Sequence, residues 1–148
     1  FKRHYPAVEV SITAPDTLLM IPMDIILVEQ VLINLMENAV QHGKTTTKIE
    51  LRLSSTGGFA VFEVADNGCG IEKELLPHLF EGYLTRDHEE ISDQRRNMGI
   101  GLSVCMSIVQ AHGGSMRAKN RKKGGALLQF TLPLEEISHE YQREGSSN

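Results

Sequence analysis

Four polar side chains stand at helical spacing inside an apolar stretch, the segment NLMENAVQH (34–42). At 100° per residue, Asn34, Asn38, Gln41 and His42 fall along one stripe of a helix. An unsatisfied buried carboxamide costs on the order of 1–3 kcal/mol, so both asparagines need polar partners. In a core, neighbouring backbone groups or water would satisfy them. Alternatively, they line a pocket where their oxygens act as ligands of a Mg²⁺ ion that keeps several of its waters.

The segment ADNGCGI (65–71) combines a carboxylate with two glycines at the expected end of a strand. Gly68 and Gly70 can adopt backbone conformations closed to other residues, which lets a flat ring approach the chain. A buried Asp66 beside them is suited to accept a hydrogen bond from an exocyclic amine. An ordinary Asp-Asn-Gly turn is the alternative interpretation.

The segment NMGIGLSV (97–104) places Gly99 and Gly101 at an expected helix start. Free backbone N–H groups and the helix dipole make such a start a phosphate site. The segment is not a Walker A loop, and it lacks the strand and the full G-x-G-x-x-G pattern of a dinucleotide fold. On its own the signal is weak, and it gains weight from the two segments that precede it.

Hydrophobic periodicity predicts the elements that must position these side chains. Residues 8–13 (VEVSIT) alternate as a half-buried strand does, and residues 18–23 (LLMIPM) predict a short second strand. The apolar segment 24–42 predicts a helix with Asp24 as its N-cap and Gly43 as its terminator. Both asparagines would then lie on this one helix.

The remainder of the chain alternates hairpins with helices. We predict a hairpin from strands 48–55 and 59–66, a short helix at 72–80, a charged lid at 84–98, a helix at 99–114 and a second hairpin from strands 114–119 and 126–134. These elements predict an α+β two-layer sandwich, in which about three helices cover one face of a mixed, mostly antiparallel sheet. The domain is expected to span residues 1–134, followed by a polar tail at 135–148.

Composition limits the class of protein. The chain has 148 residues, 41% of them hydrophobic and 23% charged, as in one globular domain. Its net charge of −4 argues against general nucleic-acid binding, and the basic run at 117–125 is interpreted as a solvated hairpin rather than a docking patch. No apolar run reaches the roughly 20 residues of a membrane span. Because the chain lacks an initiator Met, we expect a piece cut from a longer protein. Its two cysteines, Cys69 and Cys105, lie far apart and form no C-x-x-C pair, so we expect a domain in the reducing cytoplasm.

Taken in order, these segments resemble the ATP-binding catalytic domain of sensor histidine kinases, in the superfamily that includes gyrase, Hsp90 and MutL. The similarity is carried by the N box at 34–42, the G1 box at 66–71 (DNGCGI), the F box at 79–83 (LFEGY), the G2 box at 99–104 (GIGLSV) and the last glycine-containing strand at 124–133 (GGALLQFTLP). Residues 21–40 are also similar to KdpD-type potassium-responsive kinases.

The resemblance implies a Bergerat-type ATP-binding fold that uses ATP and Mg²⁺. Asn38 would coordinate Mg²⁺ at the ATP phosphates, with Asn34 beside it to orient water or phosphate. Asp66 would bind the adenine amine. The other implied site residues would shape the adenine pocket, anchor the lid or face the phosphates: His42, Gly68, Gly70, Ile71, Phe80, Tyr83, Gly99, Gly101 and Leu102.

The chain departs from the family pattern at three positions. Gln41, a catalytic position in the family, stands where many relatives carry a Lys that touches phosphate. Asn97 replaces the first glycine of a common G-x-G-L-G-L pattern, and Ala126 stands where Ser or Thr is frequent. Phosphoryl transfer depends on charge neutralisation, so these departures leave nucleotide binding in place and bear on the catalytic rate.

The resemblance also implies partners. The γ-phosphoryl of ATP would pass to a histidine on a separate dimerisation domain and then to a response regulator. None of the six histidines lies in an H-[ED]-x-[RK]-x-P context, so we expect the phosphoacceptor elsewhere in a parent protein that can be membrane-anchored. We expect no nucleic-acid partner and no direct membrane contact for this domain. An anti-sigma-factor-type serine kinase and a catalytically weak nucleotide-binding module, which Gln41 favours, are the alternatives.

Overall fold

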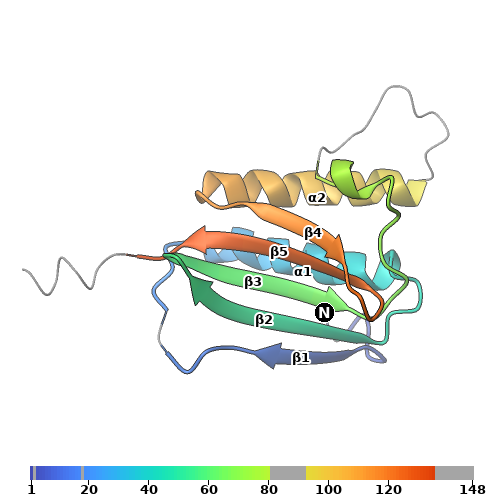
Figure 1. The fold of residues 1–148 in the computed structure, drawn as a ribbon, viewed down its shortest axis with the longest axis horizontal. Coiled ribbons are helices and arrows are strands. Elements are labelled where there is room, and N and C mark those ends of the chain that lie inside the picture. Colours follow the sequence, from blue (N-terminus) through green and yellow to red (C-terminus); the bar gives the residue numbers. More distant parts are fainter. Residues whose placement is uncertain (2, 18, 81–92, 136–148) are drawn as a thin grey trace, which may run out of the picture.

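A five-stranded sheet and two α-helices make up the computed structural model, which describes residues 1, 3–17, 19–80 and 93–135, with backbone alone for 93–100 (Figure 1). In chain order the elements are β1 (Glu9–Thr13), α1 (Ile25–Gln41), β2 (Lys48–Thr56), β3 (Phe59–Asp66), a 3₁₀ turn (Leu76–His78), α2 (Asp93–Ala111), β4 (Met116–Asn120) and β5 (Ala126–Pro133). The predicted short helix at 72–80 is therefore only this 3₁₀ turn. Among the described residues, no helix combines the length and the apolar character needed to cross a bilayer.

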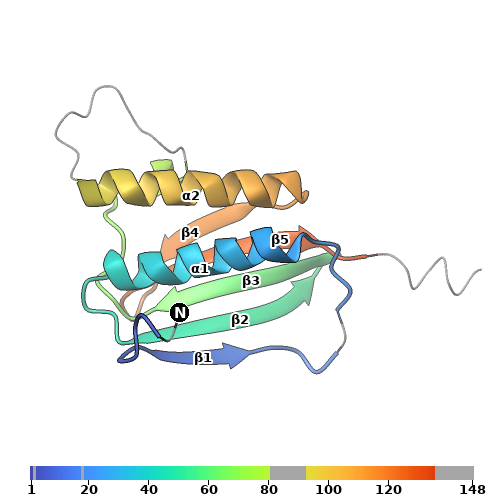
Figure 2. The same ribbon diagram turned by 180° about the vertical axis from the view of Figure 1, so that it is seen from behind.

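The sheet has the strand order β1-β2-β3-β5-β4, with β1 parallel to β2 and the other pairs antiparallel. Helix α1 lies across one face of the sheet and packs beside α2 (Figure 2). This arrangement confirms the α+β two-layer sandwich with a mixed, mostly antiparallel sheet. Both predicted hairpins are present, and the β2–β3 turn uses Gly57 and Gly58 at φ 57° and 82°, which a two-residue hairpin turn requires.

Two expectations for the first third of the chain are wrong. Residues 19–23 belong to no strand, and Pro22 has no N–H with which to join a ladder. Strand β1 forms where expected, but it is not half-buried along its length, because the exposed fraction of Ile12 is 74%. Strand β1 lies at the edge of the sheet, and the sheet contacts of α1 are made to β3.

Helix α1 forms because its sequence supplies a cap and one continuous apolar face. The Asp24 carboxylate accepts a hydrogen bond from the Leu27 N–H at 3.2 Å, which satisfies a backbone group that the helix cannot pair. The apolar face of the helix is buried in the core, and its buried residues are Val28, Val31, Leu35, Met36 and Ala39. The predicted N-cap is confirmed, and the helix ends one residue before its C-cap, His42.

Helix α2 begins at Asp93, six residues before Gly99, so the predicted start at the glycines is wrong. Residues 93–98 (DQRRNM) contain good helix formers, and an acidic first residue suits the positive end of the helix dipole. Gly99 and Gly101 therefore lie within the helix. Of the predicted lid, 84–98, residues 84–92 lie outside the described residues and 93–98 are helical.

Candidate functional site

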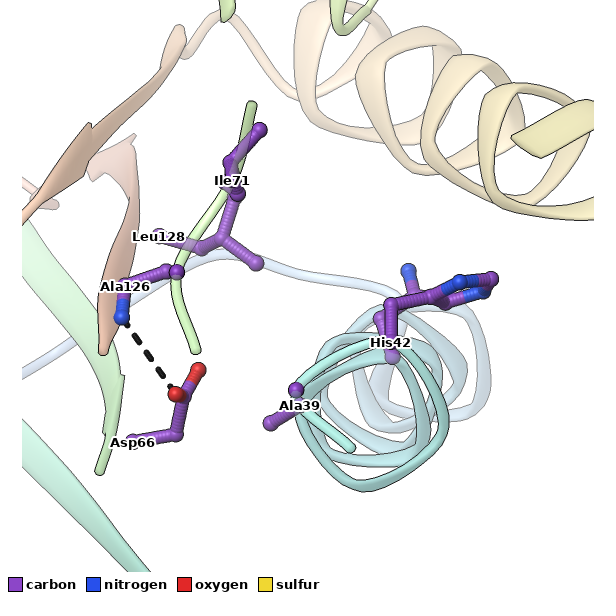
Figure 3. A pocket seen from close by; sticks show the side chains of 9 residues that line it. Ala39, His42, Asp66, Ile71, Ala126 and Leu128 are labelled. Atoms are coloured by element: carbon purple, nitrogen blue, oxygen red, sulfur yellow. Dashed lines mark hydrogen bonds between the residues drawn. The ribbon is translucent and has the colours of Figure 1, made fainter. Parts of the chain in front are cut away.

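A small, mainly apolar hollow opens where the C-terminal end of α1 faces the end of β3 and the start of β5 (Figure 3). It is lined by Asn38, Ala39, His42, Gly43, Asp66, Gly70, Ile71, Ala126 and Leu128. Ala39 and His42 come from the side of α1, while Ile71, Ala126 and Leu128 face them from the other side. The hollow therefore has apolar walls with one carboxylate between them.

Asp66 is the buried charged residue of this hollow, with an exposed fraction of 4%. Its Oδ1 accepts hydrogen bonds from the Gly68 N–H at 2.8 Å and from the Ala126 N–H at 3.3 Å. Burial raises the pKa of the Asp66 carboxyl, and these two N–H groups and the charge of Arg121 oppose that rise. Figure 3 shows the second carboxylate oxygen directed into the hollow, where it can accept from an N–H donor of a ligand.

The turn after Asp66 packs directly against the end of α1. The Cys69 N–H donates to the Gly43 carbonyl at 2.9 Å. A Cβ on Gly68 would lie 2.7 Å from the Gly43 Cα, so only glycine allows this approach. Gly70 adopts φ 82°, a backbone conformation that other residues rarely adopt. Both glycines are thus required by the geometry of the turn.

The predicted stripe of polar side chains divides among three surroundings. The Asn34 Nδ2 donates to the Cys105 Sγ on α2 at 3.6 Å, and burial raises the pKa of that thiol, which keeps it neutral. Asn38 lines the hollow, and its buried Nδ2 has no hydrogen-bond partner among the described residues. Gln41 is exposed, and its Nε2 donates to the Tyr5 hydroxyl at 3.1 Å.

His42 also lines the hollow, but Figure 3 shows its ring directed away from Asp66. Burial lowers the pKa of the His42 imidazole, which favours the neutral ring. A neutral ring at this edge offers a flat apolar surface without a charge. It is consistent with the expectation that His42 packs near a base, which stays a prediction.

Five of the predicted site residues line the hollow, namely Asn38, His42, Asp66, Gly70 and Ile71. Gly68 lies beside them, because its N–H donates to the Asp66 carboxylate. Others do not line it. Phe80 and Leu102 pack into the hydrophobic core, Gly101 lies in α2, and Asn34 and Gln41 are bonded elsewhere. Gly99 lies in the same helix. Tyr83 lies outside the described residues.

Sequence reasoning missed two side chains that hold the hollow. The Arg121 Nη1 donates to the Asp66 backbone oxygen at 2.8 Å, and Asn120 bonds to the backbone of Ile71. The basic run at 117–125 does form the predicted hairpin, but Arg121 is not simply solvated. No local signal marks these residues, because their partners are 55 and 49 positions away.

Comparison with known proteins shows which family this chain matches. The family described as "Histidine kinase-, DNA gyrase B-, and HSP90-like ATPase" matches residues 23–136. The sensor protein KdpD of Clostridium acetobutylicum is 39% identical over 135 residues, which cover 91% of this chain and 14% of KdpD. The chain thus spans about one seventh of that relative's length.

Solved structures show the same fold. The ATP binding domain of PrrB from Mycobacterium tuberculosis has a TM-score of 0.71 and 27% identity, covering 90% of this chain and 85% of that domain. Full-length ShkA, solved in complex with AMPPNP, has a TM-score of 0.68 and 26% identity, covering 88% of this chain and 26% of ShkA.

Proposed function

Because the chain belongs to the histidine kinase-, DNA gyrase B- and HSP90-like ATPase family and is a histidine kinase-type ATP-binding catalytic domain, we propose that it binds Mg-ATP at Asp66 and phosphorylates a histidine of a separate dimerisation domain. The observation that carries this proposal is the buried Asp66 carboxylate between apolar walls. An adenine ring needs both features, a flat apolar slot and an acceptor for its amine.

The adenine ring would lie between Ala39 on α1 and Ile71 and Leu128 opposite. Asp66 has one oxygen occupied by two backbone N–H groups and one oxygen directed into the hollow. The second oxygen would accept from the exocyclic amine. A base with a carbonyl at that position would place two acceptors face to face, so the site should favour adenine.

Asn38 would hold the Mg²⁺ ion at the edge of the hollow. Its carboxamide lines the pocket, and its Oδ1 would be the metal ligand. The buried Nδ2, which has no partner among the described residues, would donate to a phosphate oxygen. Mg²⁺ binds oxygen ligands and usually keeps waters beside a phosphate, so one protein carboxamide suffices. When bound, the ion would neutralise phosphate charge during transfer. Asn34, one turn before Asn38, would orient water or phosphate, as the family pattern implies.

The parts of the site that would meet the phosphates are proposals from the family pattern. The family pattern implies that Gly99, Gly101 and Leu102 face the phosphates, but all three lie within α2, where backbone N–H groups pair inside the helix. Phe80 and Tyr83 would flank the segment that covers the nucleotide. The phosphoacceptor domain of the same protein and a response regulator would be the partners. Phosphoryl transfer depends on bringing the acceptor histidine in line with the γ-phosphate, so the partner's placement controls the rate.

Isothermal titration calorimetry tests the adenine assignment. ATP should bind in a Mg²⁺-dependent manner, and Asp66→Ala should abolish measurable binding because the amine loses its acceptor. Asp16→Ala, at an exposed loop position, is the matched control and should bind as the parent chain does. Unchanged ATP affinity in Asp66→Ala would reject the assignment.

A catalytically weak nucleotide-binding module is the second candidate, and Gln41 favours it. This neutral side chain stands at the family's lysine position and is bonded to the Tyr5 hydroxyl. The two candidates differ in the rate at which a supplied phosphoacceptor domain is phosphorylated. Measurable phosphoryl transfer by the parent chain supports the kinase. ATP binding by the parent chain without transfer, together with transfer by the Gln41→Lys variant, supports the module.

A further inference from the structure

The β4–β5 hairpin forms the outer support of the hollow. Its strands place Asn120 opposite Ala126, at the end of the hairpin nearest Asp66. From this end Ala126 donates to the Asp66 carboxylate and Arg121 donates to the Asp66 carbonyl. Gly125 is buried against the same carbonyl, and a Cβ there would clash with it. The hairpin therefore holds the strand end that carries the carboxylate.

Asn120 extends this support to the far side of the turn. Its Oδ1 accepts from the Ile71 N–H at 2.7 Å, and its Nδ2 donates to the Ile71 carbonyl at 2.7 Å. One carboxamide thus pairs with both polar backbone groups of one residue, as a neighbouring strand would. Asn120 keeps an exposed outer side, while Ile71 is buried.

The pairing fixes the width of the hollow, because Ile71 is one of its walls. The residue before it, Gly70, lies so close to Asn120 that a Cβ on Gly70 would be 2.8 Å from the Asn120 Oδ1. The turn 66–71 is therefore held at one end by Arg121 and Ala126 and at the other by Asn120. Without the Asn120 carboxamide, the Ile71 end of this turn would lose both of these side-chain hydrogen bonds.

We propose that Asn120 is a positioning residue for base recognition, which acts by fixing Ile71 and the turn after Asp66 in the geometry that fits adenine. The inference rests on the proposed function, since it names a residue that shapes the same pocket. Asn120 touches no part of the ligand. It acts on affinity and base selectivity through the backbone of Ile71.

Nucleotide affinity and base selectivity test this role. Dissociation constants for Mg-ATP and Mg-ITP, whose base carries a carbonyl in place of the amine, are measured well below the midpoint of thermal unfolding. Asn120→Ala should raise the constant for ATP about tenfold, which corresponds to about 1.4 kcal/mol, and should lower the preference for ATP over ITP. Asn120→Asp keeps an acceptor for the Ile71 N–H but places a second acceptor against the Ile71 carbonyl, so it should also raise the constant for ATP. It carries the same test if Asn120→Ala does not fold.

The matched control lies at the other end of the same hairpin, where the Thr131 hydroxyl accepts from the Ser115 N–H at 3.1 Å. Thr131→Val removes one side-chain bond to the backbone, as a purely structural change would, and should leave both nucleotide constants unchanged. If the parent chain binds ATP and Asn120→Ala binds it with the same affinity and selectivity, the inference alone is overturned. If the parent chain binds neither nucleotide, the proposed function falls with it.

Discussion

Asn34 and Asn38 are the same residue type one helical turn apart, yet their surroundings give them opposite energetic roles. The Asn34 amide is paired with the Cys105 sulfur. The Asn38 amide is buried and unpaired among the described residues. A paired group contributes to stability, whereas a buried unpaired group costs free energy that a bound ligand or water recovers. The second arrangement is typical of a binding residue.

Alanine substitutions separate the two roles. Asn34→Ala should lower the free energy of unfolding by about 1 kcal/mol, because a hydrogen bond is lost between the helices. Asn38→Ala should leave the free energy of unfolding unchanged or slightly raise it, and should remove the Mg²⁺ dependence of ATP binding. Urea denaturation and calorimetry with and without Mg²⁺ measure both. A strongly destabilised Asn38→Ala variant would contradict a role reserved for the ligand.

The buried Asp66 carboxyl should make the free energy of unfolding depend on pH. Burial raises the pKa of its carboxyl above the ordinary 3.8. A raised folded-state pKa means that the stability contribution is complete below the unfolded pKa and is lost as the pH rises through the folded one. Asp66→Asn keeps an Oδ1 acceptor and cannot ionise. The variant should therefore gain unfolding free energy over the parent chain as the pH rises from about 3 towards neutrality. A constant difference across that range in urea titrations would contradict the burial effect.

Gly101 tests where α2 begins. It lies within the helix, and a Cβ built on it meets nothing within 4 Å outside the helix's own backbone. Glycine inside a helix costs roughly 0.5–1 kcal/mol relative to alanine. Gly101→Ala should therefore raise the free energy of unfolding of the nucleotide-free chain by about that amount. The same substitution should lower the affinity for ATP if the missing side chain of Gly101 lets a phosphate approach the backbone. A loss of stability in thermal denaturation would show that the glycine has a non-helical conformation.

The elements that were predicted correctly are those with local signals at both ends. Helix α1 has its N-cap at Asp24, and the β2–β3 hairpin has paired glycines at 57 and 58. The predicted start of α2 at Gly99 is wrong because a glycine there does not end the helix, and residues 93–98 favour a helix by propensity. The strand expected at 18–23 has apolar residues, but residues 19–23 form no ladder, and the Met20 carbonyl accepts a backbone hydrogen bond from the Glu135 N–H. A sequence alone does not reveal whether a segment finds a strand to pair with.

The same distinction applies to the hollow. Asp66, Gly68 and Gly70 form one local turn, so their proximity follows from the sequence alone. Asn120 and Arg121 reach that turn only because β4 pairs with β5 and β5 pairs with β3. Their contribution depends on tertiary register. The long-range half of the site is therefore the part that sequence reasoning could not supply.

The molecule as a whole places its hollow at the end of the sheet where α1, β3 and the β4–β5 hairpin meet. Two of the described histidines, His42 and His112, are poorly placed to accept a phosphoryl group there. His112 has both ring nitrogens engaged: Nδ1 donates to the Ile108 carbonyl at 2.8 Å, and Nε2 accepts from the Asp24 N–H at 3.0 Å. The His42 ring is directed away from Asp66 (Figure 3).

We therefore expect this chain to transfer phosphate only to another domain. Incubated with γ-labelled Mg-ATP, it should acquire no label that is stable in alkali and lost in acid, the signature of phosphohistidine. Adding the dimerisation domain of a KdpD-type kinase should produce such label on that domain alone, because no histidine of this chain lies in an H-[ED]-x-[RK]-x-P sequence. The Asp66→Ala variant is the control and should label neither protein. Alkali-stable label on the chain itself would show that one of its own six histidines is an acceptor and would contradict the division of labour proposed for this domain.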